Sequence, residues 1–257
     1  MSHVADHRQI VRDVFTRSSN SYVARKESVD QASHEAMVRL SGVRSTDAVL
    51  EVACGPAFVG LLFAEKARIV VGIDLAQLEK AATLKTSRGV RNLSLVEGDV
   101  DSLPFSSESF NVVACHKAFH HLSRPGRVLQ EIHRVLSTRG RLVLGDSLSS
   151  DDPAKSELHN EIERLRDPSH VKMYVLAELR NFLSSAGFEI EQYERLEDER
   201  EFDWWMSVIS PPANIVEQIR TKLIESMPGD ATGLWLRLDG GKLLMKRRSI
   251  VLVASKA

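Results

Sequence analysis

The stretch Val49-Leu-Glu-Val-Ala-Cys-Gly-Pro-Ala-Phe-Val-Gly60, followed by Ile69-Val-Val-Gly-Ile-Asp74, decides the fold of this chain. The apolar run at residues 49–52 is typical of a buried parallel strand, and the small residues after it let a ligand approach the backbone closely. The order is therefore strand, tight turn, helix, strand and acid. Asp74 lies 23 residues after Glu51, near the interval of about 20 that brings a carboxylate onto ribose hydroxyls in βαβ nucleotide sites.

The turn distinguishes two classes of cofactor. A dinucleotide site needs glycines spaced GxGxxG so that a pyrophosphate can rest on helix amides, whereas this turn reads Ala53-Cys-Gly-Pro-Ala57. Glu51 would repel a diphosphate, but its charge suits a cofactor that carries an ammonium and a sulfonium. The residues therefore favour S-adenosylmethionine over NAD.

Composition sets the scale of the protein without selecting its chemistry. The chain has 257 residues, and 34 Lys and Arg against 35 Asp and Glu give a net charge of −1. Bulk attraction to nucleic acid is therefore not expected. No apolar stretch approaches the ~18 residues that span a bilayer, and residues 1–6 lack an export pattern. We expect no membrane partner and a cytoplasmic location.

The two cysteines, Cys54 and Cys115, have no metal-ligand spacing. Both end neighbouring strands of the expected sheet, so close approach is one interpretation. Packed free thiols are the interpretation that we prefer.

Strand and helix signals alternate through the first two thirds of the chain. We expect strands at residues 48–52, 68–73, 92–96, 110–115 and 141–144, with helices at 59–66, 76–86 and 123–136. The dipeptide Arg139-Gly140 is expected to break the helix at 123–136 before the fifth strand begins. Five such cycles with short links predict a Rossmann-like α/β fold, with a mostly parallel sheet covered by helices on both faces.

The flanking segments are predicted from weaker signals. Further helices are expected at residues 10–15, 26–40, 159–166, 176–186 and 215–226, and further strands at 188–194 and 248–255. Polar residues 16–21 should break the first two helices, and residues 147–153 should form a turn-rich link. Gly187 is expected to cap a helix, and the acidic run at 189–203 should be a solvated face.

Six motifs occur in an order that identifies a family. They are Glu51-Val-Ala-Cys-Gly, Gly72-Ile-Asp74, Gly98-Asp-Val-Asp-Ser-Leu-Pro-Phe105, Ser109-Phe-Asn-Val-Val, His120-His-Leu122 and Arg134-Val-Leu-Ser-Thr-Arg-Gly-Arg-Leu-Val-Leu144. Over residues 10–195 the chain resembles class I S-adenosylmethionine-dependent methyltransferases. Within that class it is similar to the small-molecule enzymes of the ubiquinone/menaquinone-biosynthesis type.

The resemblance implies a seven-stranded sheet in which strand seven is antiparallel and lies between strands five and six. It also implies one domain over residues 1–257. Its parts would be N-terminal helices (1–45), a cofactor-binding core (46–146), a helical insertion or cap (147–176) and a C-terminal part with a substrate-side lid (177–257).

The same resemblance implies that S-adenosylmethionine lies across the carboxyl ends of strands one to four. Asp74 would accept both ribose hydroxyls, Leu75 would pack on the adenine face, and Asp99 with the Val100 amide would read the adenine edge. The other expected cofactor-binding residues are Tyr22, Glu51, Ala53, Cys54, Gly55, Ala57, Gly98 and His116. The competing interpretations are structural, with Asp74 as a helix cap and Asp99 as a turn carboxylate. The family usually has glycine where Ala53 and Ala57 stand.

Methyl transfer is an in-line displacement that chiefly requires aligned and desolvated reactants, so a base is optional. Candidate bases lie beyond the strand ends: His116, His120, His121, Asp146 and His170. We prefer His121 and His170 as catalytic residues, against the interpretation that both are structural. No metal is expected, because the histidines lack a carboxylate at ligand spacing.

The acceptor is expected to be a small, hydrophobic or aromatic molecule that is methylated on O, N or C. Aromatic residues expected in its pocket are Phe15, Tyr22, Tyr174, Phe202, Trp204 and Trp205. A core position and a subunit contact explain the two tryptophans equally well, which leaves a homodimer open.

Other functions remain open. The end of strand four lacks the Asn/Asp-Pro-Pro-aromatic motif of enzymes that methylate exocyclic amines of DNA, so nucleic acid is not an expected partner. A binding module that holds the cofactor without acceptor chemistry is one alternative. An NAD(P)-dependent oxidoreductase is the other, and the missing GxGxxG opposes it.

Overall fold

The computed structural model describes the backbone of residues 2–76 and 78–257 and all side chains in these ranges except those of residues 2–6 and 25–29. A mixed sheet forms its centre, in the order β3-β2-β1-β4-β5-β8-β6, with β7 added to β8. The strands are β1 (Ala48–Val52), β2 (Ile69–Asp74), β3 (Leu93–Glu97), β4 (Phe110–His116), β5 (Leu136–Leu148), β6 (Phe188–Glu201), β7 (Arg237–Asp239) and β8 (Lys242–Lys256).

The expected Rossmann-like fold is confirmed. Strands β1 to β5 are parallel to one another, and β8 lies antiparallel between β5 and β6. All seven expected strands are present, and one further short strand, β7, forms a hairpin with β8. Its signal is Asp239-Gly240-Gly241, since the left-handed φ angles of 54° at Gly240 and 81° at Gly241 suit a two-residue hairpin turn.

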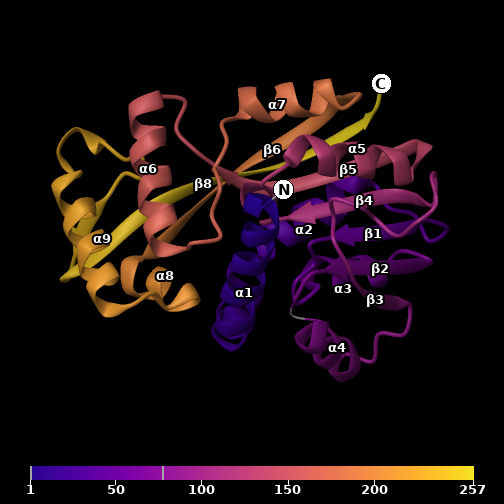
Figure 1. The fold of residues 1–257 in the computed structure, drawn as a ribbon, viewed down its shortest axis with the longest axis horizontal. Coiled ribbons are helices and arrows are strands. Elements are labelled where there is room, and N and C mark those ends of the chain that lie inside the picture. The colour runs from indigo at the N-terminus through magenta and orange to yellow at the C-terminus, as the bar shows by residue number, and fades with distance from the viewer. Residues whose placement is uncertain (1, 77) are drawn as a thin grey trace.

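Helices cover both faces of the sheet (Figure 1). They are α1 (Ser2–Val29), α2 (Gln31–Ser41), α3 (Phe58–Ala64), α4 (Leu78–Ser87), α5 (Pro125–Val135), α6 (Pro153–Arg166), α7 (Leu176–Ser185), α8 (Phe202–Ile209) and α9 (Ala213–Glu225). Strand residues alternate between two cores, because successive side chains point to opposite faces. Leu50 packs with α5 and α7, whereas Val49 packs with α2, α3 and α4.

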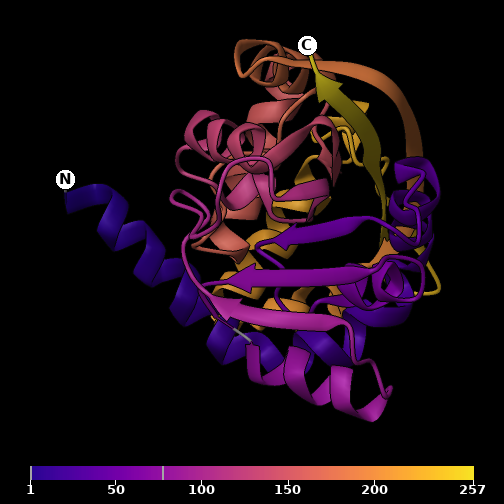
Figure 2. The ribbon, with the colours of Figure 1, turned by 90° about the vertical axis from the view of Figure 1, so that its right-hand side faces the viewer.

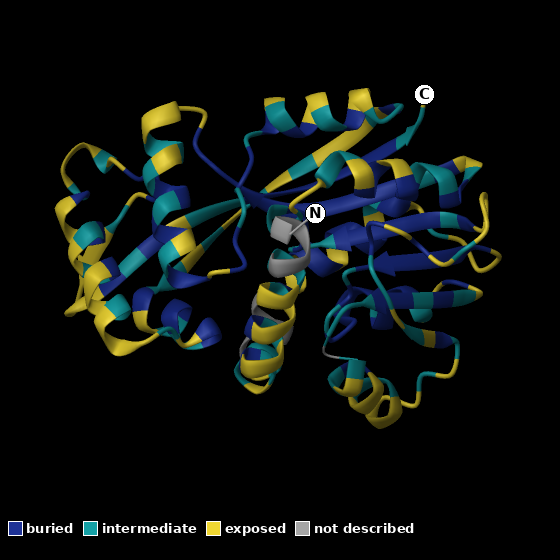
Figure 3. Ribbon diagram, in the orientation of Figure 1, coloured by how far each residue is buried: buried dark blue, intermediate teal, exposed yellow. Residues whose placement is uncertain are grey.

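A separate lobe is built on the long ends of β6 and β8, which run past the rest of the sheet (Figure 1). Helices α6, α8 and α9 cover this ribbon and enclose an apolar core around Phe202 and Trp205. In Figure 3 the buried residues form two regions, one in the main sheet and one in the lobe. Helix α8 was not predicted.

Helix α1 crosses the side of the sheet toward which the parallel strands point (Figure 2). The predicted break at residues 16–21 was wrong, because α1 continues from Ser2 to Val29. The hydroxyl of Ser18 donates to the Val14 carbonyl at 2.8 Å, which satisfies a polar side chain inside a helix. The hydroxyl of Ser21 donates to the Val208 carbonyl at 3.0 Å and so fastens α1 to α8.

Two further boundaries differ from prediction. Strand β5 begins at Leu136, so Arg139-Gly140 does not separate it from α5. A Cβ at Gly140 would lie 2.9 Å from the Ser137 carbonyl, and glycine therefore permits a tight bend within the strand. Helix α6 begins at Pro153 because the Asp152 side chain accepts from the backbone N–H groups of the first turn.

The acidic run lies mostly on β6, at the edge of the sheet, where its side chains pair with bases on other elements. Lys246 lies 2.5 Å from Glu197, and Arg237 lies 2.9 Å from Glu199. Charged side chains are typical of an exposed edge strand, because they oppose pairing with another chain. Among the described residues, no helix has both the length and the apolar character needed to cross a bilayer.

Candidate active site

The carboxyl ends of β1, β2 and β4 face α1 across a cavity of about 990 Å³ that is partly open to solvent. We call it the first cavity. Of the expected cofactor-binding residues, Ala57 and Gly98 do not line it. Those that do are Tyr22, Glu51, Ala53, Cys54, Gly55, Asp74, Leu75, Asp99, Val100 and His116.

The turn after β1 is held in left-handed backbone conformations. Ala53, Gly55 and Ala57 have φ angles of 50°, 50° and 60°, values that glycine adopts more readily than alanine. The Gly55 N–H donates to Asp74 Oδ2 at 2.7 Å, so the second strand fixes the turn after the first. Ala57 is buried at the start of α3, and its N–H donates to the Cys54 carbonyl at 2.8 Å, which closes the turn.

Glu51 places a carboxyl group inside the protein at the wall of the first cavity. It is 3% exposed, and its Oε2 accepts a hydrogen bond from the Gly60 N–H at 2.8 Å. A Cβ at residue 60 would lie 2.6 Å from this oxygen, so only glycine permits the contact. Burial raises the pKa of Glu51 to about 8 because the buried carboxylate lacks a compensating positive charge. A ligand with positive charge would stabilise the ionised form, so the site favours such a ligand.

Asp74 occupies the end of β2, as the sequence predicted. Its Oδ1 accepts from the Ala76 N–H at 2.8 Å, so it does organise the turn before α4. Burial raises its pKa to about 6, although the Gly55 and Ala76 amides oppose this shift. Two carboxylate oxygens offer about four acceptor positions, which leaves capacity for a ligand.

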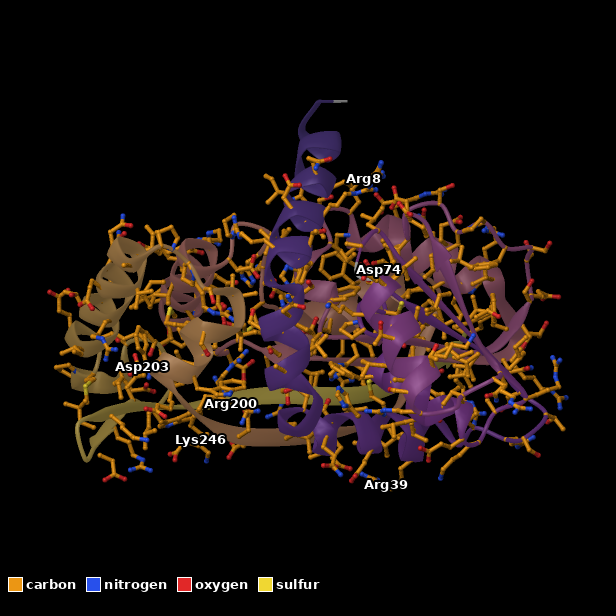
Figure 4. The ribbon with its side chains drawn as sticks, turned by 90° about the horizontal axis from the view of Figure 1, so that it is seen from below. Arg8, Arg39, Asp74, Arg200, Asp203 and Lys246 are labelled. Atoms are coloured by element: carbon orange, nitrogen blue, oxygen red, sulfur yellow. The ribbon has the colours of Figure 1, made fainter. Side chains whose placement is uncertain are left out.

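Sequence reasoning missed the ion-pair cluster at the mouth of the first cavity. One terminal nitrogen of Arg8 lies 2.7 Å from Asp99 and 2.8 Å from Asp101. Arg124 lies 2.6 Å from Asp101 on the other side. Figure 4 shows Arg8 on the same side of α1 as Asp74. No local pattern marks Arg8, because its partners lie more than 90 residues away.

A second cavity of about 450 Å³ adjoins the first. The two share four lining residues, Phe15, Tyr22, Lys117 and His121. The second cavity is also lined by His120, Ser147, Glu163, Arg166, Asp167, Met173, Val208, Ile209 and Arg247. The lining of the second cavity is thus only partly apolar, in contrast to the expected pocket, because α6 and β8 contribute charged groups.

The two preferred catalytic histidines lie in different surroundings. His121, in a short 3₁₀ helix (Phe119–His121), lines both cavities, and its Nδ1 lies 3.0 Å from the Ser169 carbonyl oxygen. Burial lowers its pKa to about 4. His170 lines neither cavity, its Nε2 lies 2.8 Å from Asn160 Oδ1, and burial lowers its pKa to about 3.

The aromatic residues divide between the cavities and the cores. Phe15 and Tyr22 line both cavities and meet edge to face at 5.9 Å. Trp204 packs against residues of α1 and α8 instead. The other three are buried in apolar cores: Tyr174, Phe202 and Trp205.

Both cysteines are buried free thiols. Burial raises the pKa of Cys54 and of Cys115, so each thiol stays protonated at neutral pH. In the part of the chain that the structure describes, no three His, Cys, Asp or Glu side chains gather as a metal site.

Comparison with known proteins identifies the family. Residues 50–144 match the methyltransferase domain family. Over 211 residues the chain is 28% identical to the uncharacterized methyltransferase YcgJ of Bacillus subtilis, an alignment that covers 81% of this chain and 83% of YcgJ. The crystal structure of YcgJ matches with a TM-score of 0.81 at 27% identity, over 88% of this chain and 98% of the other. Residues 50–144 are a methyltransferase domain, and the chain is an S-adenosylmethionine-dependent methyltransferase.

The methyltransferase also shows 30% identity over 173 residues to 27-O-demethylrifamycin SV methyltransferase of Amycolatopsis mediterranei, covering 65% of this chain and 64% of that enzyme. Its first cavity fits S-adenosylmethionine chemically. The buried carboxyl of Glu51 gains from a neighbouring cation, and Asp74 offers acceptors at the strand end where ribose hydroxyls bind in related folds. When bound, the cofactor supplies the activated methyl group.

Proposed function

We propose that this methyltransferase holds its cofactor in the first cavity and methylates a small molecule that enters the second cavity. The observation that carries the proposal is the shared wall of Phe15, Tyr22, Lys117 and His121. This wall joins a cofactor-sized space to a smaller space with its own charged groups. The similar Amycolatopsis enzyme is named for a small-molecule acceptor, 27-O-demethylrifamycin SV.

In this proposal each residue of the first cavity contacts a particular part of the cofactor. Asp74 accepts the ribose hydroxyls, and Leu75 and Val100 enclose the adenine between apolar side chains. Asp99 meets the adenine edge while Arg8 holds its carboxylate in place. Glu51 lies toward the cationic methionine end, where its charge is needed.

The acceptor in this proposal carries both an apolar ring and polar groups. Phe15 and Tyr22 offer aromatic surface at the junction of the cavities, while Lys117 and Arg247 face the second cavity with positive charge. Demethylmenaquinone methyltransferase of Listeria monocytogenes is 24% identical over 210 residues, covering 71% of this chain and 89% of that enzyme. This similarity supports a ring-bearing acceptor of the quinone type.

Calorimetric titration of Asp74→Ala tests the donor site. Loss of hydrogen bonds to a charged group, worth about 1.5 to 3 kcal/mol, should weaken S-adenosylmethionine binding by roughly 10-fold to 150-fold. Asp239→Ala, an exposed carboxylate on β7, is the matched control and should bind like the wild type. Unchanged affinity in Asp74→Ala would remove this residue from the site, and binding of NAD in place of S-adenosylmethionine would reject the proposal.

Transfer of a labelled methyl group tests the acceptor side. The panel contains phenols, quinols, amines and carboxylic acids, and we expect turnover of a ring-bearing member. Cofactor binding without turnover of any member would favour the module that binds the cofactor and lacks acceptor chemistry.

A further inference from the structure

His120 lines the second cavity and pairs with the buried carboxylate of Asp146. Asp146 lies near the carboxyl end of β5 and is 2% exposed. Its Oδ1 lies 2.6 Å from His120 Nδ1, and its Oδ2 accepts from the His120 backbone N–H at 3.0 Å. The Ser147 N–H donates to Oδ1 at 2.6 Å. One carboxylate thus fixes both the backbone and the ring of His120.

This geometry decides which ring nitrogen of His120 carries the proton. A carboxylate accepts hydrogen bonds only, so Nδ1 is the donor and Nε2 keeps its lone pair in the neutral ring. Burial alone would raise the pKa of Asp146, but His120 and Lys117 hold it below its usual value. The carboxylate therefore stays ionised at neutral pH, and it stabilises a proton that arrives on Nε2.

His120 faces the second cavity and does not line the first. Its side chain is 14% exposed, whereas both neighbouring histidines are engaged elsewhere, His121 with Ser169 and His170 with Asn160. The ring centroid of His120 lies 4.1 Å from that of His121 and 5.6 Å from that of His170. Asp146 contacts His120 but does not line the second cavity. The other titratable or charged groups that line it are Tyr22, Lys117, His121, Glu163, Arg166, Asp167 and Arg247.

We propose that His120, oriented by Asp146, is the general base of the transfer, and that the acceptor is a phenol or enol that is methylated on oxygen. The proposal rests on the proposed function, because it places the acceptor in the second cavity. A phenol or enol becomes strongly nucleophilic only as it loses its proton, so a positioned base is of use to this class. A carboxylate or a neutral amine already presents its lone pair.

The step balances as follows. The hydroxyl proton moves to His120 Nε2 while an oxygen lone pair forms the new bond to the methyl carbon. The bond between that carbon and sulfur breaks, and its electron pair stays on sulfur. The products are the methyl ether, S-adenosylhomocysteine and an imidazolium at His120, which returns its proton to solvent. Asp146 is a positioning residue and takes no proton.

The test compares His120→Gln with His133→Gln, a histidine on α5 that lines neither cavity, as the matched control. Methyl transfer to phenols and to amines is measured from about pH 5 to 9, across the titration of an imidazole. In the wild type, transfer to phenols should rise with pH through one protonation step and then level off. His120→Gln should lose about 10²-fold to 10⁴-fold in kcat and lose this step, with unchanged cofactor affinity. His133→Gln should keep the step.

Two results would overturn the proposal. One is a His120→Gln enzyme that keeps both its rate and its pH step, and the other is a wild type that methylates amines but no hydroxyl compound. The second result leaves the proposed function standing, whereas a wild type that binds no S-adenosylmethionine would reject the proposed function itself. Nitrogen-15 NMR of the wild type needs no variant, and a proton on Nε2 in place of Nδ1 of neutral His120 would also overturn the proposal.

Discussion

At the scale of single residues, the donor site depends on carboxyl groups that the fold has removed from water. Backbone hydrogen bonds from Gly60 and Val59 favour the charged form of Glu51, but burial and the nearby charge of Asp74 disfavour it more strongly. The same burial that weakens its ionisation in the free protein strengthens its attraction for a cation. Asp74, at the end of β2, shares this property.

Cofactor binding should therefore release a proton in the pH range set by Glu51. Its pKa of about 8 means that the free protein holds this proton at neutral pH, while the cationic ligand favours the ionised form. Affinity should rise as pH increases toward 8, by up to about tenfold per unit. Calorimetry in buffers with different heats of ionisation measures the released proton. Glu51→Gln should abolish the part of this dependence above pH 7, and its persistence would assign it to another group.

The alanines of the turn should cost stability. Ala53 has a φ of 50° and Ala57 a φ of 60°, and a left-handed conformation costs a non-glycine residue about 1–2 kcal/mol. Ala53→Gly should therefore raise the free energy of unfolding by roughly 0.5–1 kcal/mol, after the entropy cost of glycine. Urea denaturation is the measurement. Ala57→Gly relieves the same strain but removes a buried methyl, so its gain should be smaller.

At the scale of elements, helix ends and crossings decide where the site residues lie. Helix α1 spans the gap between the sheet and the lobe and supplies Arg8, Phe15 and Tyr22 to the cavities. Helix α7 ends at Ser185, and Gly187, with a φ of 81°, turns the chain into β6 two residues later. This glycine cap was predicted from sequence, because a left-handed residue after a helix favours glycine.

Gly187→Ala tests this cap. The left-handed conformation and a Cβ placed 3.2 Å from His133 Nε2 should together lower the free energy of unfolding by roughly 1–2 kcal/mol. Gly126→Ala on α5 is the control, because its Cβ meets no atom within 4 Å and alanine favours a helix. Thermal denaturation should separate the two variants, and equal melting temperatures would contradict the cap.

At the scale of the whole molecule, the long ribbon of β6 and β8 carries the lobe whose inner side closes the second cavity. Trp205 is buried in the lobe core, and the guanidinium of Arg166, which lines the second cavity, lies over its ring at 4.5 Å. The core of the lobe is thus in direct contact with the wall of the second cavity.

Trp205→Ala should destabilise the protein by about 3–5 kcal/mol, because it leaves a large cavity in this core. Acceptor turnover should fall more than cofactor affinity, since Arg166 loses its support. Trp235→Ala, at a position that is 46% exposed, is the control and should change stability little. Denaturant titration and cofactor calorimetry measure the two effects. An unchanged free energy of unfolding in Trp205→Ala would contradict the described core.

The sequence could bring together much of the lining of the first cavity, because residues 51–74 are close in sequence. The strand, turn and acid from Glu51 to Asp74 form one βαβ unit, and its geometry follows from strand pairing between neighbours. Periodicity likewise predicted β1 to β4 within one or two residues. It failed at α1, where serines bond back to the helix, and at α8, whose apolar residues carry no clear period.

The sequence by itself determined the order of the seven main strands, the methyl donor and the acids at the ends of β1 and β2, because these depend on short-range periodicity and local turns. Only the tertiary structure decided that Arg8 meets Asp99, that Asp146 orients His120, and that Trp205 belongs to the lobe core. Each of these contacts depends on how whole elements pack, and packing energies sum over many side chains that are distant in sequence. A continuous sequence motif therefore indicates the cofactor, whereas the second cavity forms only where separate elements pack together.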